Sequence, residues 1–244
     1  MRIQTQSRTV FFHGQPITYE LERKSVKNIN LRVKPDGSIH ASANRRVSAE
    51  RVDSFVLSKG AYILDVLDRF ASLEQTPVPP RQFVTGEVFS IQGQDYTLKI
   101  SQGPTDAVFT DGDALLLQTR DPSDAAKRER LVIGYLESQC RDVFRAILEE
   151  LFPLFQPYGA AMPALRFRDM KSRWGSCHVT KGVITLNKKL LGMPRAYGEY
   201  VMTHELCHLV HPNHSKQFYD LLATFMPDWK ERRTALNRMP ARWP

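Results

Sequence analysis

The sequence is poor in cysteine and has no long apolar run. Its cysteines, Cys140, Cys177 and Cys207, are odd in number and show no C-x-x-C spacing, which disfavours a disulfide framework and a thiolate zinc site. No stretch approaches the roughly 18 apolar residues of a membrane span, and residues 1–7 lack the apolar segment of a secretory signal. These absences predict a cytoplasmic protein with reduced thiols and no membrane partner.

Internal repeats, low-complexity tracts and a P-loop pattern are also lacking, whereas positive charge is abundant. The 244 residues are 42% hydrophobic and 25% charged, as expected of a globular protein. The net charge is +8, and residues 161–244 alone carry 14 basic and 6 acidic side chains. Such a field attracts anionic partners, so a nucleic acid or a nucleotide is a possible partner beside a peptide or protein substrate. Nothing in the sequence indicates an oligomeric state.

The first half of the chain is rich in strand patterns. Residues 8–43 alternate apolar β-formers, with a turn at Pro35-Asp36-Gly37, and an amphipathic helix follows from the N-cap Ser48 to about Phe70. The proline-rich segment 76–80 is a connector, and a second β-rich run covers residues 83–118.

A long helix is predicted to begin at Asp121-Pro122 and to end before Pro153. Its apolar positions form a core-facing stripe: Val132, Leu136, Cys140, Val143, Ile147 and Leu151. Two short strands near residues 165–168 and 183–186, and helices near 195–210 and 215–226, complete the pattern. We therefore predict the α+β class, with a β-rich domain over residues 1–120, carrying one covering helix, and a second domain over residues 121–244.

Four of the seven histidines lie within residues 204–214. On a helix, His204 and His208 project about 40° apart, one turn apart, so both imidazoles can bind one tetrahedral Zn²⁺. Glu205 lies about 100° round from His204, which suits it to act as the general base of a metal-dependent hydrolase. This H-E-x-x-H arrangement is expected only about 0.01 times by chance in such a chain.

Three residues are candidates for the third metal ligand. Pro212 biases His211 away from helical geometry, so the helix should end there and the chain should turn to bring His214 back to the metal. Asp220 on the next helix and His211 are the alternatives. Zinc held by His204, His208 and His214 would keep one coordination position open.

The sequence around these histidines resembles that of the YgjP-like metallopeptidases, which are relatives of the SprT and WLM zincins. The resemblance rests on His204-Glu-Leu-Cys-His-Leu, Asn213-His214-Ser215 with Phe218, Arg173-Trp-Gly-Ser-Cys177, and the hairpin from Arg32 to Gly37. It implies a zincin-like fold for the second domain, zinc binding by His204, His208 and His214, and a catalytic Glu205. The spacing equals that of metzincins, but His211 stands where those enzymes have glycine.

Other side chains have weaker candidate roles. Arg173 is a candidate catalytic donor to the developing oxyanion, and Tyr200 and Tyr219 are possible donors of the same kind. By analogy with zincins, the strand from Gly182 to Asn187 could border the cleft and pair with an extended substrate.

The favoured function is a zinc-dependent hydrolase that acts as a metallopeptidase. An alternative is nucleotide phosphoanhydride hydrolysis, motivated by basic residues expected near the cleft: Arg166, Arg168, Lys171, Arg173, Lys188 and Lys189. A third possibility is a nucleic-acid-associated module with a structural zinc, which fits less well because structural sites usually have four protein ligands.

Overall fold

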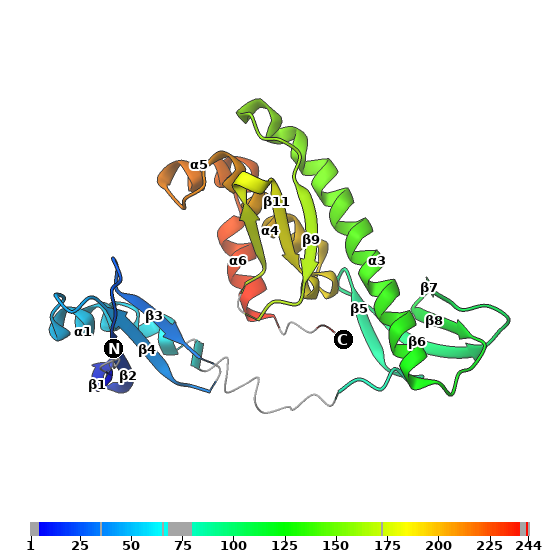
Figure 1. Cartoon of the computed structure of the whole chain (residues 1–244), viewed down its shortest axis with the longest axis horizontal. Coiled ribbons are helices and arrows are strands. Elements are labelled where there is room, and N and C mark those ends of the chain that lie inside the picture. Colours follow the sequence, from blue (N-terminus) through cyan, green and yellow to red (C-terminus); the bar gives the residue numbers. More distant parts are fainter. Residues whose placement is uncertain are drawn as a thin grey trace. The chain divides into compact units, whose positions relative to one another are not determined.

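The computed structural model describes residues 5–34, 36–64, 66, 67, 80–171, 173–239 and 243. The chain divides into two compact units, Met1–Pro79 and Pro80–Pro244 (Figure 1). Both helices and strands are present, which confirms the mixed α and β class. Among the described residues, no helix combines the length and the apolar character needed to cross a bilayer.

The first unit is a four-stranded sheet with a helix packed on one face. Its order is β1-β2-β4-β3, with β2 and β4 parallel and the other pairs antiparallel. Alternate residues of β2 (Ile17, Tyr19 and Leu21) are buried with Val52 and Val56 of α1. The elements are β1 (Thr5–Phe12), β2 (Gln15–Arg23), β3 (Asn30–Val33), β4 (Ile39–Ala43) and α1 (Ala49–Ser58).

Two local signals of this unit are confirmed. The Ser48 side chain caps α1 by accepting from the Arg51 amide at 3.3 Å. Gly37 adopts a φ of 76° in the turn before β4, where its amide donates to Lys34. The predicted Pro35, Phe70 and nearly all of the connector at 76–80 lie outside the described residues.

The second unit begins with another four-stranded sheet, of order β5-β6-β8-β7, which packs on a long helix. The strands are β5 (Val88–Ile91), β6 (Gln94–Gln102), β7 (Ala107–Asp111) and β8 (Ala114–Thr119), and the helix is α3 (Ala125–Leu151). Phe89, Leu98 and Leu117 of the sheet share one core with Leu136 of α3. The sheet therefore belongs to the same unit as α3, and the boundary predicted near residue 121 lies inside that unit.

Helix α3 begins three residues later than predicted. Asp124 is its N-cap and accepts from the Lys127 amide at 2.9 Å, whereas Asp121 accepts from the Ser123 amide in the preceding turn. Phe144 and Leu148 are buried in place of the predicted Val143 and Leu151, which are half-buried. The remaining members of the predicted stripe are buried as expected.

A three-stranded sheet and three helices follow. The strands are β9 (Ala164–Arg168), β10 (Gly175–His178) and β11 (Val183–Asn187), and the helices are α4 (Arg195–Val210), α5 (Lys216–Phe225) and α6 (Trp229–Arg238). Short 3₁₀ turns lie at Phe152–Leu154, Gln156–Tyr158, Val179–Lys181 and Lys188–Gly192. The strand order is β10-β11-β9, with β11 antiparallel to β10 and parallel to β9.

The position of β11 corrects one expectation. The predicted substrate-pairing strand, Gly182 to Asn187, is the central strand and is paired on both sides. The edge next to the histidines is instead formed by β10, whose Gly175 lines the same pocket as His204. Strand β10 and helix α6 were not predicted from the sequence.

Candidate metal centre

Helix α4 presents two of the predicted imidazoles on one face. It begins after Pro194 and ends at Val210, before Pro212, as the sequence predicted. His204 and His208 are one turn apart, and their ring centroids are 5.0 Å apart. The rest of the helix is largely buried, so these two rings hold a fixed place in the fold.

The third imidazole comes from the turn after α4. The chain leaves the helix at His211, and the Ser215 amide donates to the carbonyl of Asn213 in a tight turn. This turn brings His214 Nε2 to 3.1 Å from His204 Nε2. His211 lies at the C-cap, and Asp220 is exposed and paired with Lys216 at 2.8 Å, so neither alternative joins the cluster.

The three imidazoles fit a divalent cation. One nitrogen from each lies within 4.8 Å of the others, and two nitrogens bound to one tetrahedral zinc are about 3.3 Å apart, close to the observed 3.1 Å. Burial lowers the pKa of His204 to about 3 and also lowers the pKa values of His208 and His214, so the rings are in the neutral form that binds metals. Within the described part of the chain, Nδ1 of His204 and of His208 are buried without a hydrogen-bond partner.

An aromatic floor supports the cluster. Phe218 of α5 is fully buried, and its ring centroid is 5.0 Å from that of His204, 4.6 Å from that of His208 and 4.7 Å from that of His214. Ser215 caps α5 by accepting from the Phe218 amide, which fixes this ring relative to the turn that carries His214. The apolar floor limits water access from below and so strengthens electrostatic interactions at the site.

Glu205 lies beside the imidazoles with a carboxylate that is nearly inaccessible. It is 5% exposed, and its Oε2 has no hydrogen-bond partner among the described residues. Burial raises the pKa of Glu205 to about 7, against the opposing effects of the Arg173 charge and the Cys177 amide. A buried carboxylate with a free oxygen is suited to accept a proton from water held in the site.

Gly175 explains part of the Arg173-Trp-Gly-Ser-Cys177 motif. A Cβ at this position would lie 2.5 Å from Glu205 Oε1 and 2.9 Å from a methyl group of Val201. Only glycine therefore lets β10 approach the carboxylate. The loop before β10 is held by Asn187, whose side-chain amide donates to the carbonyls of Met170 and Arg173 at 2.8 and 2.9 Å.

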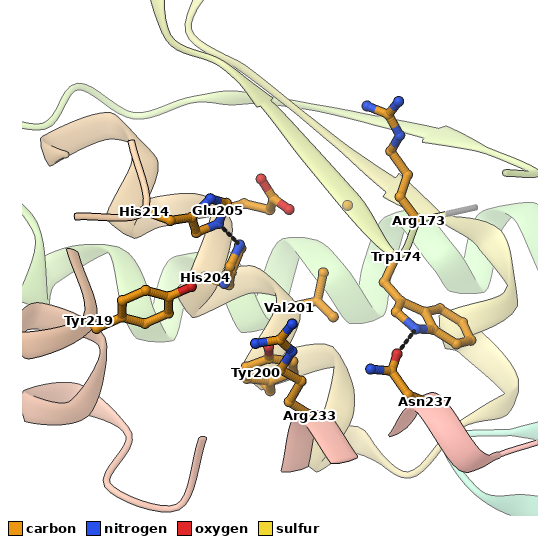
Figure 2. A pocket seen from close by; sticks show the side chains of 11 residues that line it. Arg173, Trp174, Tyr200, Val201, His204, Glu205, His214, Tyr219, Arg233 and Asn237 are labelled. Carbon is orange, nitrogen blue, oxygen red and sulfur yellow. Dashed lines mark hydrogen bonds between the residues drawn. The ribbon is translucent and has the colours of Figure 1, made fainter. Parts of the chain in front are cut away.

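Two of the imidazoles, those of His204 and His214, line a pocket of about 420 Å³ (Figure 2). Tyr219 stacks between His214 and Trp229, with centroid distances of 5.9 and 5.2 Å, and its hydroxyl points toward the imidazoles. Tyr200 is buried below, and burial raises its pKa to about 12. The lining residues are Arg173, Trp174, Gly175, Tyr200, Val201, His204, Glu205, His214, Tyr219, Arg233 and Asn237.

Two arginines line this pocket from different elements. Arg173 is exposed and its guanidinium lies apart from the imidazoles, and its charge favours ionised Glu205 (Figure 2). Arg233 of α6 lies nearer the imidazoles, and its charge contributes to the lowered pKa values of His204 and His214. Arg233 was not predicted from the sequence. Its helix could have been predicted from Asp228 at the N-cap and from Trp229 and Leu236, which are seven residues apart and share one helix face.

Most of the basic residues expected near the cleft lie elsewhere. Arg166, Arg168 and Lys188 line a separate hollow beside α3, and Lys189 pairs with Asp169 at 3.1 Å. Of the six residues named from the sequence, only Arg173 lines the pocket with the histidines. The expectation that these residues lie near the cleft, which motivated a nucleotide substrate, is therefore wrong for most of them.

A comparison with protein families finds one that matches most of the chain. The profile of the family described as YgjP-like, metallopeptidase domain, matches residues 27–239. No curated protein matches the chain.

Two solved structures resemble part of the chain. The zymogen of the metallopeptidase abylysin from Pyrococcus abyssi is 23% identical, with a TM-score of 0.34 over 38% of this chain and 90% of that one. The zymogen of the metallopeptidase jannalysin from Methanocaldococcus jannaschii is 18% identical, with a TM-score of 0.34 over 39% of this chain and 94% of that one. The family match extends over most of the sequence, and the chain belongs to the YgjP-like metallopeptidase family.

Proposed function

We propose that this metallopeptidase is a zinc enzyme in which His204, His208 and His214 hold the ion and Glu205 is the general base. The observation that carries the proposal is the convergence of three neutral imidazoles beside one buried carboxylate. Bound there, the cation would supply a Lewis acid for a peptide carbonyl. Three protein ligands would leave a coordination position open, as catalytic zinc sites require.

Glu205 would remove a proton from the attacking water and later donate it to the leaving amine. The carboxylate is suited to this role because its Oε2 is free and because β10 shields it from bulk solvent. Arg173 would favour the ionised carboxylate before attack through its charge. Tyr219, fixed by stacking on Trp229, would donate its hydroxyl proton in a hydrogen bond to the developing oxyanion.

The substrate would bind as an extended segment along β10. This strand is an edge of its sheet, and Gly175 at its start lines the pocket. Edge strands present unpaired backbone groups that a peptide can pair with. Such pairing would position a scissile bond near the imidazoles without demanding a particular side chain.

The Glu205→Gln variant tests the assignment. We expect hydrolysis of labelled casein to fall about a thousandfold, with an unchanged zinc content measured by mass spectrometry. Asp220→Asn is the matched control, because Asp220 is an exposed carboxylate outside the pocket; it should retain both zinc and activity. Wild-type hydrolysis by the glutamine variant would contradict the proposal.

A further inference from the structure

The sheet that carries β10 has a second free edge, formed by β9. Among the described residues, strand β9 pairs only with β11. It lies beside α3, where Phe167 packs on Phe144 at a centroid distance of 5.9 Å (Figure 1). Two adjoining hollows of about 470 and 350 Å³ lie between this strand and the helix. We call them together the β9–α3 groove. Neither hollow includes a residue of the metal centre.

The backbone of β9 directs some of its hydrogen-bonding groups away from its sheet. The Ala164 amide donates to the carbonyl of Gly182, so Ala164, Arg166 and Arg168 direct their backbone groups toward β11. The amides and carbonyls of Leu165 and Phe167 therefore point away from the sheet. These groups can accept one more strand.

Positive charge surrounds this edge. Arg166 and Arg168 are exposed on one face of β9, and Arg141 and Arg145 are exposed one turn apart on α3. Among the described residues, none of these four arginines has an ion pair or a side-chain hydrogen bond. The acids of the groove are Glu137, which pairs with Lys188, and Glu149. The groove thus has more positive charge than its own acids can neutralise.

The other face of the strand is apolar. Leu165 and Phe167 are half-buried there, and Leu148 and the 54% exposed Met162 line the same hollow. Along any strand the side chains alternate between the two faces. Every second residue therefore lies on the same face, at a spacing of about 6.7 Å. The groove therefore offers charge on one face of an added strand and apolar contact on the other.

We propose that the β9–α3 groove binds an extended peptide segment with acidic side chains at alternate positions and apolar ones between. The segment adds to β9 as a further strand through the backbone groups of Leu165 and Phe167. Its acidic side chains lie beside Arg166 and Arg168 as cross-strand pairs. This docking site is separate from the proposed catalytic site, because β11 and β10 lie between β9 and the metal centre.

The groove favours a peptide over a single-stranded nucleic acid. Sequence-tolerant binding of nucleic acid depends on exposed aromatic rings on which bases stack. Phe167 is the aromatic residue among those that line the groove, and its ring is half-buried against Phe144. The free edge amides, in contrast, have a direct use in binding a peptide backbone.

Fluorescence anisotropy with a short labelled peptide of alternating Glu and Val tests the proposal on the full-length protein. Saturable binding is expected, and Arg166→Glu with Arg168→Glu should weaken it about tenfold or more. The matched control reverses Arg45 and Arg46, two exposed arginines of the first unit, and should bind like wild type. Mass spectrometry verifies that the peptide stays intact during the measurement.

Backbone pairing is tested by N-methylation of the peptide. Methyl groups on one set of alternate amides should abolish binding, whereas methyl groups on the other set should leave it unchanged. Equal tolerance of both sets would overturn strand addition. Absence of peptide binding, an equal loss in the Arg45 and Arg46 control, or tighter binding of a single-stranded oligonucleotide would also overturn the proposal.

Discussion

At the scale of single residues, a glycine rather than a charged group determines how close the wall of the pocket comes to Glu205. In Gly175→Ala the new methyl group would lie 2.5 Å from Oε1 and force the carboxylate to move. A misplacement of about 1 Å in an active site can lower the rate about a hundredfold. We expect peptide hydrolysis to fall to that extent while zinc content is retained.

Gly134→Ala is the control for this substitution. Gly134 lies within α3, and apart from the backbone of its own helix no atom lies within 4 Å of an added Cβ. Alanine there should leave activity unchanged and raise the free energy of unfolding by about 0.5–1 kcal/mol, because alanine favours the helix. Full activity in Gly175→Ala would show that the close approach of β10 to Glu205 is unimportant.

The assignment of the third ligand is a second prediction for single residues. His214→Ala should weaken zinc binding about a hundredfold or more in competition with a chromogenic chelator, because it removes one of three donors. His211→Ala should keep wild-type affinity, since His211 lies at the C-cap outside the cluster. The reverse pattern would assign the ligand to His211.

At the scale of elements, a polar network joins β1, β2 and α1 of the first unit. The Arg8 guanidinium donates to both oxygens of Asp53, and the Tyr19 hydroxyl donates to Oδ1 at 2.7 Å. These bonds hold the pKa of Asp53 below its usual range. A lowered carboxyl pKa stabilises the fold above the unfolded-state value near 4, and this stability is lost as the pH falls through the folded-state pKa.

Asp53→Asn should therefore be less stable than wild type at pH 7, by about 1–2 kcal/mol. The difference between the two proteins should shrink as the pH falls from about 4 through the lowered folded-state pKa of Asp53, because the protonated carboxyl is then uncharged like the asparagine side chain. Urea unfolding followed by circular dichroism at several pH values measures the difference in the free energy of unfolding between the two proteins. A difference that is constant with pH would exclude an ionised Asp53 as the cause.

The elements that sequence reasoning found and missed differ in how they are stabilised. Helices α4 and α5 are predictable because local signals mark their limits: the sequence argument used Pro212, and the structure places Pro194 and Ser215 at their N-caps. Strand β10 has only four residues, including Gly175 and Ser176, and exists through its pairing with β11. Helix α6 is highly charged and buries only Trp229 and Leu236, so its apolar periodicity is weak.

The residues of the candidate metal centre also divide into those with local sequence signals and those placed by tertiary contacts. Its three imidazoles and Glu205 lie within eleven residues and could be predicted from helical spacing and one proline. Tyr219 was also named from the sequence and lines the pocket, whereas Gly175 and Arg233 reach it through the tertiary packing of β10 and α6. A single sequence carries no local signal for such contacts.

At the scale of the whole molecule, two domain boundaries can be compared. The sequence predicts one near residue 121, and the compact units divide at Pro79. They predict different stabilities for C-terminal fragments. A fragment of residues 80–244 should unfold cooperatively and bind zinc. A fragment of residues 121–244 would lose the core contacts of Phe89, Leu98, Leu115 and Leu117, all buried in the same cluster as α3. Each is worth about 1.5–3 kcal/mol, and their sum equals much of a typical stability.

Thermal unfolding followed by circular dichroism distinguishes the two fragments. We expect a sharp transition for residues 80–244 and aggregation or a broad transition for residues 121–244. A stable, zinc-binding fragment of residues 121–244 would restore the boundary predicted from the sequence and would make the sheet β5–β8 dispensable to the metal centre.

The closeness of the three histidines along the chain has a consequence for partial unfolding. Because only nine residues lie between His204 and His214, ordering them costs little loop-closure entropy, whereas β10 reaches Glu205 from some thirty residues upstream. Mild denaturant can then detach the strand while the helix and its turn stay intact. Turnover would be lost at lower urea concentrations than those that release the ion, and the inactive species would still be a metalloprotein.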